Sequence, residues 1–229
     1  MNATDPPPPA QLEAVSDTDK PQAARLITLL ERFGGRHALV LGCFSLAATL
    51  LLAVLQGLTK DPIDKNALED LRRSLEQVIP AGIHDNNPAA DTVQLKVDGV
   101  PLLVYRARKA DHVTGVAFEA KGNGYSGNIR VLLGIDASGK LLGVRVLQHT
   151  ETPGLGDKIE VTRSDWITRF TGKSLDDPPD AKWAVKKDGG PFDQFSGATI
   201  TPRAVVNIIR DGLRLFAAHR KTLLEEGSP

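Results

Sequence analysis

The chain changes from polar to apolar early in its sequence. Residues 1–20 contain the run "DPPPPA" and scattered acids, a composition typical of a disordered tail. In residues 23–33, "AARLITLLERF", apolar side chains recur at helical spacing with charged side chains between them. This pattern predicts an amphipathic helix that lies on a membrane surface.

An uninterrupted apolar stretch follows from Ala38 to Leu58, "ALVLGCFSLAATLLLAVLQGL". It contains no charge and one amide, Gln56, and as a helix it would span roughly 30 Å, the thickness of a hydrocarbon core. A buried core helix seldom runs this long without a polar face. A cleaved signal peptide would need a shorter polar leader and a small-x-small cleavage site. We therefore predict an uncleaved single-span anchor at residues 37–58, preceded by a tail at 1–36.

The basic residues at the two ends of the anchor bear on its orientation. Their raw numbers are equal: Lys20, Arg25, Arg32 and Arg36 precede the span, and Lys60, Lys65, Arg72 and Arg73 follow it. Arg32 and Arg36 lie nearest the bilayer, and charges inside a long translocated domain count for little. The sequence therefore favours a cytoplasmic N-terminus, with residues 59–229 on the other side of the membrane.

Beyond the anchor the pattern becomes that of a globular domain. Residues 64–79 predict an amphipathic helix that Asp64 caps and Pro80 ends; its apolar stripe is Leu68, Leu71, Leu75 and Ile79. Alternating apolar positions then predict five strands, at about 91–97, 101–108, 112–120, 129–136 and 140–149. Short turns join these strands, which implies antiparallel pairing.

Two more helices are predicted after the strands. Ser164 caps a short helix at 164–171, and residues 172–195 form a long polar connection. Thr201 caps the last helix, at about 202–220, in which Pro202 occupies the first position. The predicted class is α+β: an antiparallel sheet flanked by helices, preceded by one N-terminal transmembrane helix.

Composition narrows the chemistry. A formal net charge of zero argues against a nucleic-acid partner, which usually needs a basic face. The single cysteine, Cys43, excludes intramolecular disulfides, thiolate metal clusters and paired-thiol redox chemistry. The histidines are isolated along the chain, and no Ser/His/Asp arrangement or metal-ligand cluster is visible. A hydrolase or a metal site therefore has no positive support.

Three stretches are rich in glycine or polar residues in a way that a core does not need. They are "KGNGYSGNI" (121–129), "HTETPGLGDK" (149–158) and "FDQFSGATITPRAV" (192–205). The first two are also consistent with ordinary loops, and the third with a helix-capping segment. In the third, Gly197 and Ala198 leave the Thr199 hydroxyl sterically open. The start of the following helix would favour an anion there.

The third stretch resembles a known recognition sequence. Its residues Asp193-x-x-Ser196-Gly197-Ala198-Thr199 match the Asp-x-x-Ser/Thr-Gly-Ala-Thr sequence that bacterial flavin transferases recognise. "ETPGLG" at 151–156 and "GYSGNI" at 124–129 are stretches of the same family, in the same order. One N-terminal span followed by this domain looks like the G subunit of the Rnf (also called Rsx) electron-transport complex. The resemblance covers about residues 37–220.

The resemblance implies a cofactor and the residues that hold it. In that family the final threonine, here Thr199, is joined to the phosphate of FMN by a phosphoester bond, so the chain would be a phosphoprotein with a covalent flavin. Asp193, Ser196, Gly197 and Ala198 would form the sequence that the flavin transferase reads, with Thr201 as the near alternative to Thr199. The residues implied to border the flavin ring are Tyr125, Glu151, Thr152, Pro153, Gly154, Leu155 and Gly156.

The resemblance also implies a function. The Rnf complex couples electron transfer between ferredoxin and NAD to ion movement across the membrane. This chain would be an electron relay in it, anchored in a bacterial inner membrane with its domain in the periplasm, partnered by the other Rnf subunits and without substrate turnover of its own. Three alternatives stay open: the C subunit of the sodium-pumping quinone reductase, a non-redox periplasmic binding module, and a flavoenzyme acting on a small molecule.

Overall fold

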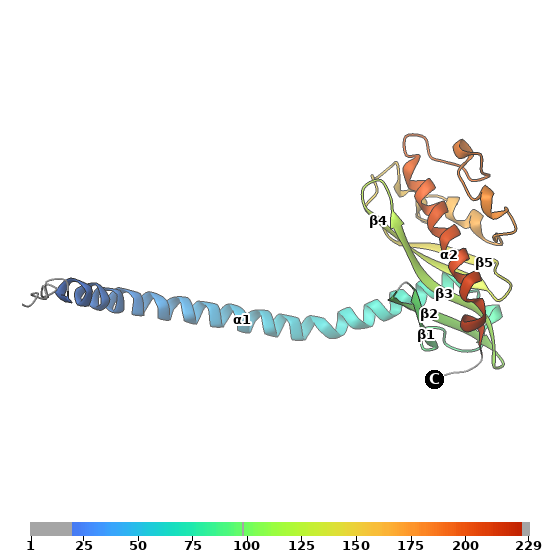
Figure 1. Cartoon of the computed structure of the whole chain (residues 1–229). Helices are drawn as coiled ribbons and strands as arrows, with labels where there is room; N and C mark the ends of the chain where they lie inside the picture. The colour runs from blue at the N-terminus through green and yellow to red at the C-terminus, as the bar shows by residue number, and fades with distance from the viewer. Residues whose placement is uncertain (1–19, 98, 226–229) are drawn as a thin grey trace, which may run out of the picture. The chain divides into compact units, whose positions relative to one another are not determined.

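The structure is a computed structural model that describes residues 20–97 and 99–225 (Figure 1). The predicted disordered tail therefore lies outside the described residues, apart from Lys20. The chain divides into two compact units, Met1–Asp64 and Lys65–Pro229. The second unit contains the sheet and the three stretches singled out in the sequence.

Helix α1 runs from Lys20 to Val78 without interruption. It takes up all three helical segments predicted before the strands, at 23–33, 38–58 and 64–79. Asp64 lies inside α1, so its prediction as an N-cap is wrong. Pro62 lacks one backbone N–H, but the backbone on both sides of it stays helical.

The first unit contains a helical segment of membrane-spanning length. Its 21 residues, His37–Gly57, are long and apolar enough to cross a bilayer. Large apolar side chains along it are exposed: Leu39, Leu41, Phe44, Leu46, Leu50 and Leu52. The core helix of a soluble protein would be mostly buried, so the prediction of one N-terminal membrane-type helix is confirmed.

The second unit is built on one antiparallel sheet of five strands in the order β1-β2-β3-β4-β5. The strands are β1 (Thr92–Val97), β2 (Val100–Lys109), β3 (His112–Asn123), β4 (Asn128–Asp136) and β5 (Leu141–Gln148). Each strand pairs with the next one along the chain, as the short turns predicted. The α+β class with an antiparallel sheet is therefore confirmed.

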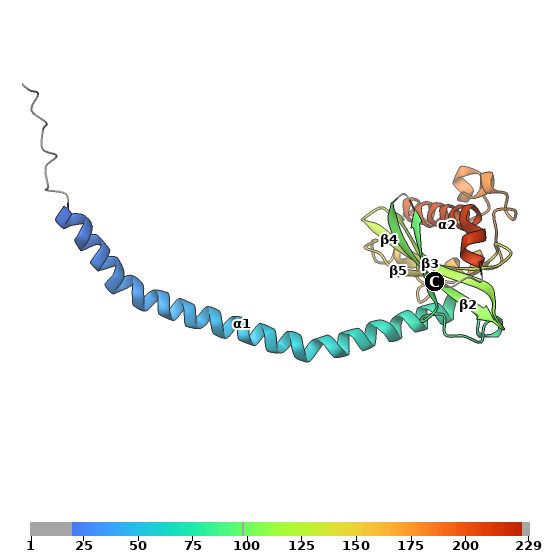
Figure 2. The same cartoon turned by 60° about the horizontal axis from the view of Figure 1, so that its bottom comes forward.

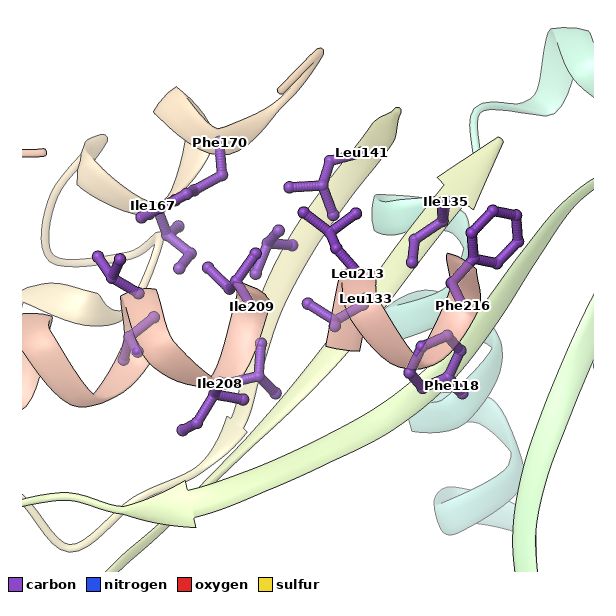
Figure 3. Packing of buried hydrophobic residues seen from close by; sticks show 14 of the residues in the cluster. Phe118, Leu133, Ile135, Leu141, Ile167, Phe170, Ile208, Ile209, Leu213 and Phe216 are labelled. Carbon is purple, nitrogen blue, oxygen red and sulfur yellow. The ribbon is translucent and has the colours of Figure 1, made fainter. Parts of the chain in front are cut away.

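Helix α2 (Ile200–Leu224) covers one face of this sheet (Figures 1 and 2). In Figure 3 Leu213 and Phe216 of α2 lie among Leu133, Ile135 and Phe118 of the strands, and Ile209 lies farther along α2, nearer Ile167. Gly212 permits this contact, because a Cβ there would collide with Leu133 Cδ1. The sheet and α2 thus form the larger part of the core, and this packing fixes the N-terminal end of α2.

The end of α1 covers the other face of the sheet. Leu75, Val78 and Ile79 form a second buried cluster with the strand residues Ala107, Ala117 and Leu132. The predicted stripe was partly wrong: Leu68 is exposed, and Val78, which the stripe left out, is fully buried. The backbone at Val78 lies very close to the sheet. A Cβ at Gly134 would collide with the Val78 carbonyl oxygen, so the glycine makes this close approach possible.

The connection between β5 and α2 is less polar than its composition suggests. The short helix predicted at 164–171 is a 3-10 helix, η3 (Trp166–Phe170), and the Ser164 hydroxyl accepts the Trp166 N–H at 3.2 Å. Farther along, Trp183 and Phe192 are buried against Phe170, with ring centroids 6.1 and 4.6 Å from it. The other short 3-10 helices are η1 (Ala81–Ile83), η2 (Asp157–Ile159), η4 (Asp180–Lys182) and η5 (Lys186–Asp188). These aromatic contacts hold the connection against the domain and lead the chain into α2.

Candidate functional site

A cavity of about 540 Å³ lies where the three glycine-rich stretches meet at the N-terminal end of α2. Its lining residues are Tyr125, Glu151, Thr152, Leu155, Gly156, Gly197, Ala198, Thr199, Ile200 and Thr201. Ligand cavities typically have volumes of about 300–1,000 Å³, so a nucleotide-sized molecule fits this size class.

The cavity brings together most of the residues singled out in the sequence. Four of them do not line it: Pro153, Gly154, Asp193 and Ser196. One lining residue, Ile200, was missed. It is an exposed apolar side chain at the first turn of α2, and its only signal in the sequence is its position next to Thr199.

Glu151 holds the three stretches together. Glu151 lines the cavity but is only 5% exposed. Carboxylate Oε1 accepts the backbone N–H groups of Tyr125 (2.9 Å) and Ser126 (3.1 Å), and Oε2 accepts the hydroxyl of Thr201. Hydrogen bonds to an ionised acceptor are stronger than neutral ones. One buried carboxylate therefore joins the β3–β4 turn, the stretch after β5 and the start of α2.

His149 supports Glu151 from the other side. The Glu151 backbone N–H donates to His149 Nδ1 at 3.1 Å, and a backbone N–H can only donate. The ring proton of the neutral imidazole therefore lies on Nε2, which donates to Glu160 Oε1 at 2.7 Å. The neighbouring Thr150 hydroxyl donates to the Ser126 carbonyl at 3.2 Å. These bonds fix the backbone from which the Glu151 side chain projects.

Gly156 leaves the space that the Glu151–Thr201 contact occupies. A Cβ at this position would lie 2.8 Å from Glu151 Cβ and 2.9 Å from Thr201 Oγ1, closer than side chains pack. The glycine is therefore required by close packing and not by an unusual backbone angle. The same holds for Gly124, whose Cβ would collide with Glu151 Oε1.

We expect Gly156→Ala to destabilise the domain and to weaken ligand retention in the cavity. The added methyl group would push Glu151 away from Thr201, and overpacking of this kind costs about 1–3 kcal/mol. Thermal unfolding followed by tryptophan fluorescence measures the loss. Gly82→Ala is the matched control, because a Cβ at Gly82 meets nothing within 4 Å and its effect should stay within about 0.5 kcal/mol. Equal melting curves for the two variants would contradict the packing argument.

Thr199 is the hydroxyl residue of the cavity best placed for modification. It is the N-cap of α2, yet its side chain makes no capping hydrogen bond. It is partly exposed and follows Gly197, which holds a left-handed φ of +81°, and the small Ala198. The unbonded amides and the positive end of the helix dipole make this position favourable for a phosphate.

Thr201 occupies a different environment, and its prediction as the helix cap is wrong. Helix α2 already begins at Ile200, so Thr201 lies within the first turn. Thr201 is 1% exposed, and its hydroxyl donates a hydrogen bond to Glu151 Oε2. The Thr-Pro pattern misled because Pro202 is also tolerated later in the first turn, where the N–H groups have no helical partner.

Asp193 lies outside the cavity, on the connection that leads into it. Its carboxylate accepts Arg169 at 2.7 Å and pairs with Lys186 at 2.5 Å, and its carbonyl accepts the Trp166 indole N–H at 2.9 Å. The hydrogen bond from Lys186, together with the charges of Lys186 and Arg169, holds the pKa of Asp193 below its usual range. The carboxylate therefore stays ionised in mildly acidic solution and ties the connection to η3.

Comparisons with known proteins identify two regions of the chain. Residues 124–214 match the family model described as an FMN-binding domain, and residues 34–78 match the one described as an RnfG N-terminal region. Two relatives are named as the G subunit of an ion-translocating oxidoreductase complex. The one from Cereibacter sphaeroides is 55% identical over 187 residues (81% of this chain and 85% of the relative). The one from Pseudomonas aeruginosa is 48% identical over 195 residues (82% and 91%).

A solved structure shares the fold. The C subunit of the Na⁺-translocating NADH-quinone reductase from Parabacteroides distasonis matches with a TM-score of 0.52, at 17% identity, over 70% of this chain and 96% of that one. At this identity the likeness concerns the fold alone. The much closer relatives are named as G subunits, which decides between the two families considered from the sequence.

Proposed function

Since the chain belongs to the family of the G subunits of ion-translocating oxidoreductase complexes, we propose that it is a membrane-anchored flavoprotein that relays electrons through FMN attached covalently to Thr199. The observation that carries the attachment site is the contrast between two threonines. Thr199 lines the cavity at the N-cap of α2 and its side chain makes no capping bond, whereas the Thr201 hydroxyl is buried and bonded to Glu151.

The residues of the chain fit the parts of FMN in different ways. A phosphate esterified to Thr199 would lie in the field of the α2 N-terminus, which favours negative charge. The cavity wall beyond it offers the exposed side chains of Tyr125 and Leu155, which suit the faces of a planar ring. When bound, FMN supplies the electron transfer, and the chain supplies its position and electrostatic surroundings. Glu151 keeps Tyr125 and the start of α2 in place through its hydrogen bonds.

Covalent attachment is tested by the mass and colour of the whole protein. We expect the chain expressed with a flavin transferase to gain the mass of one FMN less one water, because the phosphoester forms by condensation, and to stay yellow after denaturation. The chain expressed without the transferase should be colourless once it is denatured and separated from free flavin. Yellow colour that is lost on denaturation would support FMN binding without a covalent bond. A colourless protein of unmodified mass in both preparations would leave a non-redox binding module as the better description.

Asp193→Ala should slow flavin attachment more than it destabilises the domain. Asp193 is the first residue of the sequence that flavin transferases recognise, and its ion pairs are exposed, a kind that contributes little to stability. Loss of about 1.4 kcal/mol of transferase binding would slow labelling about ten-fold at limiting transferase. The rate of flavin incorporation is measured beside a thermal melt. Asp188→Ala is the matched control, because it removes another exposed ion pair, with Arg203, outside the recognition sequence. Labelling of both variants at the normal rate would show that Asp193 is dispensable.

The proposal places residues 1–36 in the cytoplasm and the flavin domain in the periplasm, with the other subunits of the complex as partners. Arg32 and Arg36 next to the anchor support this orientation. Alkaline phosphatase fused after Pro229 should then be active, and a cytoplasm-active fluorescent protein fused there should stay dark. A bright fluorescent fusion without phosphatase activity would put the Thr199 loop in the cytoplasm and overturn this orientation.

A further inference from the structure

The sheet opens between β2 and β3. Their pairing runs from Lys109↔His112 to Val104↔Phe118 and stops there, although both strands continue. Beyond that point, residues 100–103 of β2 pair with β1 alone, and residues 119–123 of β3 pair with β4 alone. In Figure 1 the tip of the β3–β4 hairpin accordingly lies apart from β1 and β2.

A large, mainly apolar groove lies at this opening. Its volume is about 850 Å³, larger than that of the cavity at the N-terminal end of α2. The facing edges contribute Leu102 and Ala120, and α2 contributes Ile208 and Leu215. Two bulky apolar residues that line it are exposed to solvent, Val100 by 61% and Leu103 by 41%. Exposed apolar surface around a hollow of this kind is typical of an interaction site.

The two edges indicate what the groove accepts. Along a strand, backbone N–H and C=O groups that do not face one neighbour face the other. Part of the main chain at 100–103 and 119–123 therefore points into the opening without a strand partner. A lipid chain or another apolar small molecule would leave these groups unsatisfied, which costs free energy in a water-excluded groove. An extended polypeptide would bond them and place alternate side chains on the apolar floor.

We propose that an extended segment of another subunit of the complex adds to this opening as a strand, along residues 119–123 of β3. The edge of β3 is the better partner, because Pro101 removes one N–H from the edge of β2. Glu119, on the β3 side, is already paired with Arg130 at 2.6 and 2.5 Å. The entering segment therefore needs apolar residues at alternate positions and no charge to neutralise Glu119.

The proposal rests on the chain's being part of a multi-subunit complex and not on the flavin. It is tested in the full chain, in membranes that contain the other subunits, with p-benzoylphenylalanine in place of Leu103 as a photo-crosslinker. We expect an adduct with a peptide of another subunit, mapped by mass spectrometry. The matched control is the same crosslinker in place of Val161, which is 48% exposed and lies outside the groove. An adduct with phospholipid alone, or equal adducts from both positions, would overturn the proposal.

Hydrogen exchange distinguishes a partner strand that pairs with β3 from a partner that covers the groove without backbone hydrogen bonds. In the assembled complex, the amides of residues 119–123 that do not bond β4 should exchange at least ten-fold more slowly than in the isolated chain. Leu103→Lys should remove this protection and the recovery of the neighbouring subunit on a tagged chain, while flavin content stays that of Val161→Lys. Unchanged exchange in the complex would overturn strand addition. Loss of flavin in Thr199→Ala with the crosslink retained would show that the two proposals stand separately.

Discussion

Thr199→Ala is expected to abolish covalent flavin attachment altogether. The substitution removes the oxygen that would form the phosphoester, and no neighbouring hydroxyl is in the same position. The Thr201 hydroxyl is bonded to Glu151 and buried, and Ser196 does not line the cavity. After co-expression with the transferase, the variant should show no in-gel flavin fluorescence and no mass increase. Its stability should change little, because the Thr199 side chain makes no capping bond.

Thr152→Ala is the control for this experiment. Thr152 is also an exposed threonine that lines the cavity, but it belongs to the stretch after β5 and not to the sequence around Thr199. It should keep the full amount of covalent flavin. A Thr199→Ala protein that remains fluorescent after denaturation would show that another residue is the attachment site. A Thr152→Ala protein without flavin would indicate that the Thr199 result reflects damage to the cavity.

Glu151→Ala is expected to have the largest effect on the domain itself. It leaves the part-buried hydrogen bonds from the Tyr125 and Ser126 backbone N–H groups and the buried one from the Thr201 hydroxyl without an acceptor, and a buried donor left without a partner costs about 1–3 kcal/mol. Because the three losses are not additive, we expect a total of about 2–4 kcal/mol. The two tryptophans, Trp166 and Trp183, both lie in the second unit, so their fluorescence during unfolding reports on the domain and not on the anchor.

Glu151→Gln separates the hydrogen bonds from the charge. The glutamine oxygen can still accept from Tyr125 and Ser126, and its amide can donate to the Thr201 hydroxyl. Most of the stability should therefore return, while the carboxylate at the cavity is replaced by a neutral amide. A glutamine variant as unstable as the alanine variant would show that ionisation of Glu151, and not its hydrogen-bonding geometry, holds the loops.

The strands and the attachment motif could be predicted from the sequence because their signals are local. Apolar alternation over a few residues placed every strand near its observed bounds, and the motif around Thr199 is continuous in the chain. The limits of α1 and α2 could not be predicted in the same way. Helix caps are weak signals, and at Asp64 and Thr201 a residue with capping chemistry lies inside a helix that packing or backbone continuity extends.

The organisation of the site depends on contacts that have no local signal. Glu151 was expected to border the flavin ring, and it lines the cavity; its hydrogen bonds to the β3–β4 turn and to a threonine 50 residues away have no local signal. The ion pairs of Asp193 join residues from separate short helices and could not be read from the motif. The opening between β2 and β3 could not be predicted from the sequence either, because the alternation of apolar and polar residues continues through both strands beyond the point where their pairing ends.

The order of the strands has a consequence for when the site can mature. Because β1 to β5 are neighbours in space in the order in which they are synthesised, the sheet needs only short-range contacts, which tend to form quickly during folding. The cavity closes only when α2 docks and Thr201 reaches Glu151, a contact of much longer sequence separation. We expect pulsed hydrogen exchange to find the strand amides protected before those of α2. A transferase that requires the formed cavity would then modify only folded chains, so that the fraction of chains carrying flavin would measure the fraction that had folded correctly.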